Sequence, residues 1–193
     1  MRILNCVEFY KPSIGGVQYH IELITNKLLE ENLKVEIATS THKNRKDFKF
    51  DYKIHEFNCS GNIVKGLNGT DIIKYQNFLI NSSYDYVLFY AAQQWSFDLA
   101  LPILHLIKGE KIFLPCGFSK FLNPIYYPYY QYLIKNKISY YDQIVCFSKQ
   151  TKDYKFLSKL KKIKIIPNGG NDFNKIQFLK KKKEYLKILN FSN

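Results

Sequence analysis

The sequence predicts an α/β fold, a Rossmann-like parallel sheet with helices on both faces. Three observations indicate this class. Short apolar, β-branched runs alternate along the chain with longer stretches of helical period. The runs are apolar on both faces, as strands are when right-handed crossovers bury both sides of a parallel sheet. The length of 193 residues suits one well-buried domain or slightly more.

Three strands and two helices are predicted in the first half of the chain. The strands are the runs RILNCVEF, KVEIATS and KIHEF. The helix between the first two is indicated by four apolar residues at helical spacing, Val17, Ile21, Ile24 and Leu28. Residues 41–52 are polar and predict a loop or irregular insertion. Glycines punctuate a second predicted loop at 61–69, before a helix at about 70–82.

The second half continues the alternation with the strands YDYVLFY, KIFLP, YDQIVCF and KIKIIP. The run WSFDLALPILHLIK predicts a helix with Pro102 inside it, and a further helix is expected after Pro128 in PIYYPYYQYLIKNKIS. Ser148 is predicted to cap a helix over KQTKDYKFLSKL.

The net charge of +13 is concentrated in the last quarter of the chain. Residues 1–148 carry 16 basic and 13 acidic side chains, whereas residues 149–193 carry 13 and 3. A basic segment attracts phosphates of any kind, whether in nucleic acid, anionic lipid or nucleotide. The same composition also fits a solvated, lysine-rich helix, so charge alone does not choose a partner.

The cysteines and the apolar runs indicate the cellular compartment in which we expect the protein. The four cysteines form no CxxC pair, which indicates reduced thiols with neither a disulfide framework nor a zinc or other metal site. Neither a secretory leader nor a membrane-spanning run is recognisable. We therefore expect a cytoplasmic protein, whose membrane contact could only be peripheral, on the inner face of a membrane.

Candidate binding residues follow the predicted strands, because ligands of such sheets bind at the carboxyl ends of the strands. Each of these positions could equally be a simple turn or helix cap. They are Gly15 and Gly16 after the first strand, Gln93 and Gln94 after YDYVLFY, Cys116 and Gly117 after KIFLP, Ser148 after YDQIVCF, and Asn168 and Gly169 after KIKIIP.

The adjacent glycines Gly15 and Gly16 are the feature that most suggests a phosphate site. Glycine allows a positive φ and removes every Cβ from the turn, so backbone N–H groups and the start of the next helix can approach an anion. The segment lacks the GxGxxG spacing of dinucleotide folds and the GK[ST] of a P-loop. A tight turn without a ligand therefore remains the alternative.

Three segments resemble the family 4 glycosyltransferases of the GT-B fold. The head MRILNCVEFYKPSIGGVQYHIELITNKLLEENLKVEIATS is similar to the opening of that family, with its strand, Tyr-x-Pro, Gly-Gly, helix and strand. YDQIVCFSKQTKDY resembles the family's strand and helix with a serine between them, and KIKIIPNGGNDF resembles its I-P-N-G-V-D signature. The motifs occur in the family's order and span nearly the whole chain.

The resemblance implies retaining transfer of a sugar from a nucleotide-sugar, without metal or other cofactor, to a carbohydrate or lipid-linked acceptor. It makes residues 1–170 the acceptor-side, N-terminal domain, and 171–193 a linker, a lysine-rich helix and the first strand of a C-terminal domain. The nucleotide site would belong to that missing domain or to a partner subunit. We therefore expect a fragment, or one subunit of a split enzyme, that is inactive alone.

Members of the family often carry a histidine in the turn after the fifth strand, whereas this chain has Cys116 there. No other histidine aligns with that position, so no catalytic residue is assigned. A buried small side chain is the expected role of Cys116, in preference to a nucleophile.

Five tyrosines between Tyr126 and Tyr132 leave three interpretations open. They could stack on a sugar, lie at a lipid interface with Lys135 and Lys137, or belong to a partly buried helix. A second function also stays open, a non-catalytic basic Rossmann-like module that binds nucleic acid or a partner protein. The sequence contains no recognisable motif for binding RNA or DNA, which argues against nucleic acid.

Overall fold

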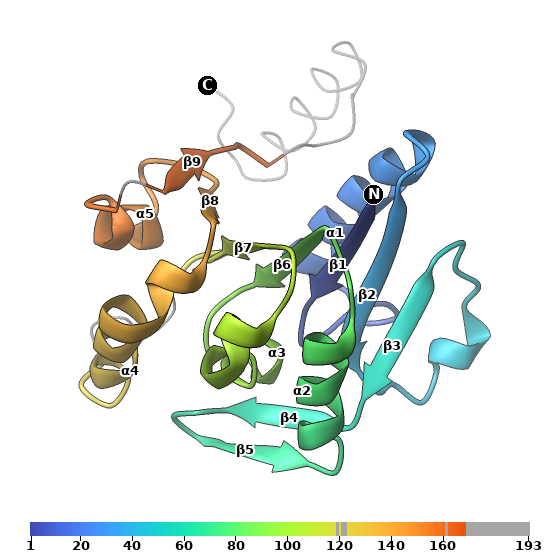
Figure 1. Ribbon diagram of the computed structural model, residues 1–193, viewed down its shortest axis with the longest axis horizontal. Helices are drawn as coiled ribbons and strands as arrows, with labels where there is room; N and C mark the ends of the chain where they lie inside the picture. Colours follow the sequence, from blue (N-terminus) through green and yellow to red (C-terminus); the bar gives the residue numbers. More distant parts are fainter. Residues whose placement is uncertain (119, 121–122, 161, 169–193) are drawn as a thin grey trace, which may run out of the picture.

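A computed structural model describes residues 1–118, 120, 123–160 and 162–168. Its centre is a seven-stranded sheet in which every neighbouring pair is parallel (Figure 1). The strands are β1 (Arg2–Cys6), β2 (Lys34–Ser40), β3 (Lys53–Phe57), β6 (Tyr86–Tyr90), β7 (Glu110–Leu114), β8 (Gln143–Cys146) and β9 (Ile163–Ile165). This confirms the predicted α/β, Rossmann-like fold.

The order of the strands creates a switch point between β1 and β6. In space the order is β3-β2-β1-β6-β7-β8-β9, so the chain moves outward from β1 in one direction and then restarts on the other side of it. Asn5 of β1 pairs with Leu88 of β6, and Cys6 with Phe89. A crevice opens outside the carboxyl ends of two strands where the winding direction reverses. The fold therefore directs attention to the ends of β1 and β6.

Helices cover both faces of the sheet. α1 (Gly16–Glu30) packs on one face, whereas α2 (Ile72–Asn81), α3 (Trp95–Asp98), α4 (Tyr127–Tyr132) and α5 (Lys152–Leu157) contribute to the core on the other (Figure 1). Side chains along β6 alternate between these two cores, with Phe89 in one and Tyr90 in the other. Both faces of the strand are buried, which explains its continuous apolar run.

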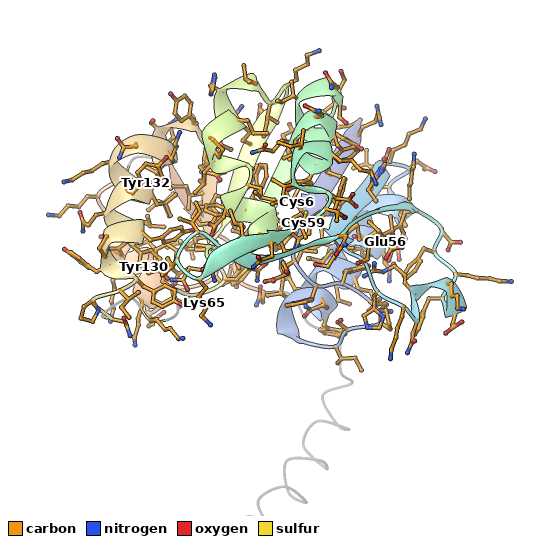
Figure 2. All side chains as sticks on the ribbon, turned by 90° about the horizontal axis from the view of Figure 1, so that it is seen from below. Cys6, Glu56, Cys59, Lys65, Tyr130 and Tyr132 are labelled. Atoms are coloured by element: carbon orange, nitrogen blue, oxygen red, sulfur yellow. The ribbon has the colours of Figure 1, made fainter. Side chains whose placement is uncertain are left out.

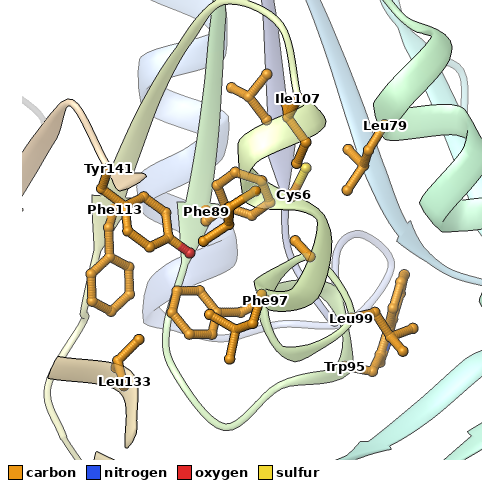
Figure 3. Packing of buried hydrophobic residues seen from close by; sticks show 14 of the residues in the cluster. Cys6, Leu79, Phe89, Trp95, Phe97, Leu99, Ile107, Phe113, Leu133 and Tyr141 are labelled. Carbon is orange, nitrogen blue, oxygen red and sulfur yellow. The ribbon is translucent and has the colours of Figure 1, made fainter. Parts of the chain in front are cut away.

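Aromatic rings fill the larger core. Figure 3 shows Phe89, Phe97, Phe113 and Tyr141 gathered between the sheet and its helices. The rings of Phe97 and Tyr141 stack with an interplanar angle of 2° and centroids 5.8 Å apart, and Phe97 also lies 4.6 Å from Phe113. All are fully buried. Aromatic rings thus pack α3 and Tyr141 against β6 and β7.

One predicted loop is a β-hairpin, so that prediction was wrong. β4 (Cys59–Asn62) pairs with β5 (Gly66–Gly69) in antiparallel register. Gly61 has a φ of +84°, and a Cβ there would lie 2.1 Å from the carbonyl oxygen of Gly66, so only glycine allows the two strands to approach. Seen from below in Figure 2, the hairpin lies across the carboxyl edge of the sheet, with Lys65 and Tyr130 at the same end.

Two predicted helices differ in extent from the observed ones, and one predicted loop contains a helical turn. The run from Trp95 forms only α3, followed by a 3₁₀-helix, η2 (Leu101–Leu106), that has Pro102 in its first turn. α4 continues as a π-helical turn, η3 (Leu133–Lys137), and a 3₁₀-turn, η4 (Ile138–Tyr140). The polar loop at 41–52 contains a short 3₁₀-turn, η1 (Arg45–Asp47).

The predicted cap of the last helix was also wrong. Thr151, and not Ser148, occupies the N-cap position of α5. The Oγ of Ser148 accepts a hydrogen bond of 3.2 Å from the Gln150 N–H, and the Thr151 hydroxyl donates to the Ser148 carbonyl at 2.8 Å. These bonds form a turn, so the helix begins at Lys152, three residues later than predicted. The predicted domain boundary at 170 and the segment 171–193 lie outside the described residues.

Candidate functional site

Most of the predicted site residues lie along the carboxyl edge of the sheet, in the turns after β1, β6, β7, β8 and β9. Hydrogen bonds connect these turns. Oε1 of Gln94, after β6, accepts a bond of 3.2 Å from the Glu8 N–H, after β1. The Ala91 N–H donates to the Leu114 carbonyl at 2.8 Å, which joins the ends of β6 and β7. Asn168 is exposed beyond β9, and Gly169 lies outside the described residues.

The two glycines do not adopt the positive φ that the sequence suggested. Gly15 is the N-cap residue of α1 with an extended backbone (φ 176°, ψ 172°), and Gly16 is the first helical residue. Glycine provides space here instead. A Cβ on Gly15 would lie 2.5 Å from Oε1 of Gln18, whose Nε2 donates to the Phe9 carbonyl at 3.0 Å. A Cβ on Gly16 would have no neighbouring atom within 4 Å.

We use the name glycine elbow for Gly15 and Gly16. A depression of about 230 Å³ borders Gly15, whereas Gly16 is not among the residues that line it. The residues around it come from the loop after β1, the first turns of α1, and Phe48. They are Lys11, Pro12, Ser13, Ile14, Gly15, Gln18, Tyr19, Glu22 and Phe48. A larger and shallower depression, about 770 Å³, lies at the amino ends of β6 and β7, and no predicted site residue borders it. The smaller one is therefore the depression that a predicted site residue, Gly15, borders.

The backbone after β6 and β7 takes left-handed conformations. Ala91, Gln93 and Cys116 have φ values of +55°, +63° and +55°, which are uncommon for residues with a side chain. α4 holds this backbone in place, because the Gln93 N–H donates to the Tyr129 hydroxyl at 3.1 Å and its Nε2 donates to the Tyr130 hydroxyl at 2.6 Å. Strain of this kind gathers at functional sites. The Gln93 amide, predicted to face a ligand, instead contacts α4.

The environment of Cys116 agrees with a structural role. Burial raises the pKa of its thiol to about 12, so the thiol stays protonated at neutral pH. Because the thiolate is the reactive form of cysteine, this position is unsuited to nucleophilic attack. Gly117, with a φ of +89°, follows it and is exposed.

Sequence reasoning missed two carboxyl groups at the switch point. Glu8 follows β1, and burial together with the nearby charge of Asp98 raises its pKa to about 7. Burial likewise raises the pKa of Asp98 to about 6, against the hydrogen bonds from the Tyr129 hydroxyl and the Ile63 N–H. The signal for Glu8 was an acidic residue interrupting the first apolar run. Asp98 sits in an apolar helix and gave no signal.

Glu8 has the chemical properties of a proton acceptor. No hydrogen bond or ion pair engages its carboxylate within the described part of the chain, and a pKa near 7 suits proton exchange at neutral pH. The start of α1 offers a complementary feature, since the first N–H groups of a helix and its dipole favour an anion. This edge can therefore bind an anion and accept a proton from a hydroxyl group.

The tyrosine run divides between core and surface. Tyr126, Tyr129 and Tyr130 are buried, as the partly buried helix predicts, whereas Tyr127 and Tyr132 are exposed. Contact with lipid by the exposed pair stays a prediction, which sedimentation with and without anionic vesicles would test. No helix in the described ranges has both the length and the apolarity to cross a bilayer. Across residues 1–168, with the gaps stated above, no three potential metal ligands cluster.

Compared with known proteins, the sequence matches no protein-family model, and a search of curated proteins gave no significant match. The structure therefore shows the fold of this chain, and these two comparisons assign it to no family. Resemblance to family 4 glycosyltransferases depends on the three sequence motifs.

Proposed function

We propose that this chain is the acceptor-side domain of a retaining, nucleotide-sugar-dependent glycosyltransferase, and that it does not turn over substrate alone. The three motifs in family order and the Rossmann-like sheet support the proposal. The observation that carries it is the open glycine elbow, where the start of a 15-residue helix meets the switch point of the sheet.

Gly16 is the residue that the protein fold alone explains least. A glycine within a helix costs up to about 1 kcal/mol relative to alanine. No neighbour would obstruct a Cβ at this position, and the backbone is helical. An approaching ligand gives a reason for the missing side chain, because an anion can then reach the helix N–H groups directly. A donor diphosphate is such an anion.

The proposed places of donor and acceptor follow from the positions of the site residues along the carboxyl edge of the sheet. The donor diphosphate lies at the start of α1, and the acceptor lies near Glu8 and Gln94, where Glu8 accepts a hydrogen bond from the acceptor hydroxyl. Gly117 and Ser148 lie in turns at the same edge of the sheet, after β7 and β8. A second domain or a partner subunit holds the nucleoside. Such a divided donor site explains why the isolated chain would bind a sugar diphosphate weakly and release no sugar.

Saturation-transfer NMR with UDP- and GDP-sugars tests this arrangement. We expect transfer to the protons of the sugar next to the diphosphate, and little transfer to the nucleobase, because the proposal assigns the nucleoside to a second domain or a partner subunit. Strong transfer to the base would contradict the proposal, as would robust sugar release by the chain alone. Oligonucleotides form the comparison arm. Binding that falls steeply with salt, with none to sugar nucleotides, would favour the nucleic-acid module instead.

A further inference from the structure

His20 carries a ring nitrogen without a partner close to the glycine elbow. The imidazole lies between the ends of two strands, 5.0 Å from the Phe147 ring after β8 and 6.1 Å from the Tyr90 ring at the end of β6. Its Nε2 is buried and has no hydrogen-bond partner within the described part of the chain. A buried polar atom of this kind calls for an explanation, because such atoms are nearly always satisfied.

The position of His20 on α1 relates it to Gly16. The two residues are four apart, so they share one face of the helix. Helical side chains lean toward the N-terminus and cover the preceding turn. The His20 ring lies on the same side of the helix as Gly16, but none of its atoms comes within 4 Å of the position that a Cβ on Gly16 would take. Since this space is open, a ligand can approach the helix N–H groups there, and it must extend beyond Gly16 along the helix to contact the imidazole as well.

Tyr90 provides a second, independent sign of an unfilled polar site. It is fully buried, and its hydroxyl also lacks a partner within the described residues. Its ring meets the ring of His20 edge-on. Two adjacent side chains from α1 and β6 thus each leave a polar atom unsatisfied at the same edge of the sheet. A bound oxygen-rich group or ordered water satisfies such atoms in folded proteins.

We propose that His20 is a substrate-binding residue of this site, whose Nε2–H donates a hydrogen bond to a phosphate oxygen of a diphosphate held at the start of α1. This inference rests on the proposed function and adds the residue that contacts the donor. Burial lowers the pKa of His20, so the ring is neutral at pH 7 and acts as a hydrogen-bond donor without becoming a cation. No proton transfer is required of it.

Imidazole NMR on the whole 193-residue chain tests the contact, with inorganic pyrophosphate as the probe at constant ionic strength. The chain has four histidines, so each ring can be followed. We expect the His20 Nε2 resonance and the backbone amides of residues 16–18 to shift saturably. His105 lies in η2 and is exposed, so its resonance serves as the internal reference and should not move. An unchanged His20 resonance while the amides shift would overturn the inference.

Two variants of His20 separate the hydrogen bond from packing. His20→Phe keeps a ring against Phe147 and Tyr90 but removes the donor, and should weaken pyrophosphate binding about tenfold or more. His20→Gln keeps an N–H donor and should retain most of the affinity. His105→Phe is the matched control. Full affinity in His20→Phe, with the amide shifts intact, would overturn the role of His20 but leave the proposed function standing. Absence of any amide shift at residues 16–18 in the wild type would overturn both.

Discussion

The hydroxyl of Tyr129 donates a hydrogen bond of 2.5 Å to Oδ1 of Asp98, and both side chains are buried. The same carboxylate accepts a bond of 2.8 Å from the Ile63 N–H at the tip of the β4–β5 hairpin. The Tyr129 oxygen also accepts from the Gln93 N–H. One buried carboxylate thus joins α3, α4 and the hairpin beside the switch point, and it fixes the turn after β6.

Removal of the Tyr129 hydroxyl should destabilise the fold. In Tyr129→Phe the packing of the ring stays, but Asp98 and the Gln93 N–H each lose a partner in a buried setting. We expect a loss of about 1–3 kcal/mol in the free energy of unfolding, measured with urea. Tyr132→Phe is the matched control, because Tyr132 is exposed, and should change stability by less than about 0.5 kcal/mol. Equal effects of the two substitutions would contradict this role of Tyr129.

Asp98 should make the folded protein less stable as pH rises. Its folded pKa of about 6 lies above its ordinary value of 3.8, so the folded state holds the proton more tightly than the unfolded state. The resulting stabilisation is complete below pH 3.8 and is lost as pH rises through about 6, by up to about 3 kcal/mol. Asp98→Asn lacks this titration. The difference between wild-type and variant stabilities should therefore change between pH 4 and 7, whereas parallel curves would refute the shifted pKa.

Glu8 should titrate near neutral pH and respond to Asp98. Burial is the main cause of its raised pKa of about 7, and the charge of Asp98 adds to it. Carbon-13 NMR of the side-chain carboxyl groups should show Glu8 titrating far above its ordinary 4.5. In Asp98→Asn the Glu8 midpoint should fall, because a like charge has been removed. A midpoint that stays unchanged in that variant would show that the two groups do not interact.

Glu36, in β2, should have the reverse effect. Burial alone would raise its pKa, but hydrogen bonds from His55, Arg2 and Tyr84 lower it to about 2. The stabilisation is present above its ordinary pKa of 4.5 and is lost as pH falls toward 2. Acid unfolding of Glu36→Gln, followed by circular dichroism, should therefore depend less on pH in this range. A slope equal to that of the wild type would show that the cluster contributes nothing.

The strands could be predicted from the sequence because a strand that is buried on both faces consists of a continuous run of apolar residues. Along β6, Phe89 faces one core and Tyr90 the other. Successive residues are therefore apolar or aromatic, and the run is readily predicted to be a strand. Once the strands are parallel, their carboxyl ends must share an edge, and the positions of Gln94, Cys116 and Ser148 follow. The edge, and with it most of the candidate site, was therefore within reach of sequence reasoning.

Features that depend on tertiary contacts could not be predicted from the sequence. The hairpin at 59–69 is rich in glycine and polar residues, and its tip is bound by Asp98, which lies 35 residues beyond Ile63. The pKa of Glu8 depends on burial and on Asp98, neither of which a local pattern records. Gln93 looked free to bind a ligand because its partners Tyr129 and Tyr130 come from α4, far along the chain.

Gly16 should separate stability from binding. A methyl group at this position meets open space, and alanine favours the helix over glycine by up to about 1 kcal/mol, so Gly16→Ala should be as stable as the wild type or more stable in thermal unfolding. A larger side chain, as in Gly16→Leu, should also fold but cover the helix N–H groups, and its affinity for pyrophosphate should fall by about tenfold or more. Ile73→Leu is the control, because Ile73 is exposed on α2 and borders neither the glycine elbow nor the depression beside it. If Gly16→Leu folds and binds pyrophosphate as the wild type does, the open space above Gly16 serves no ligand, and the anion site must lie elsewhere.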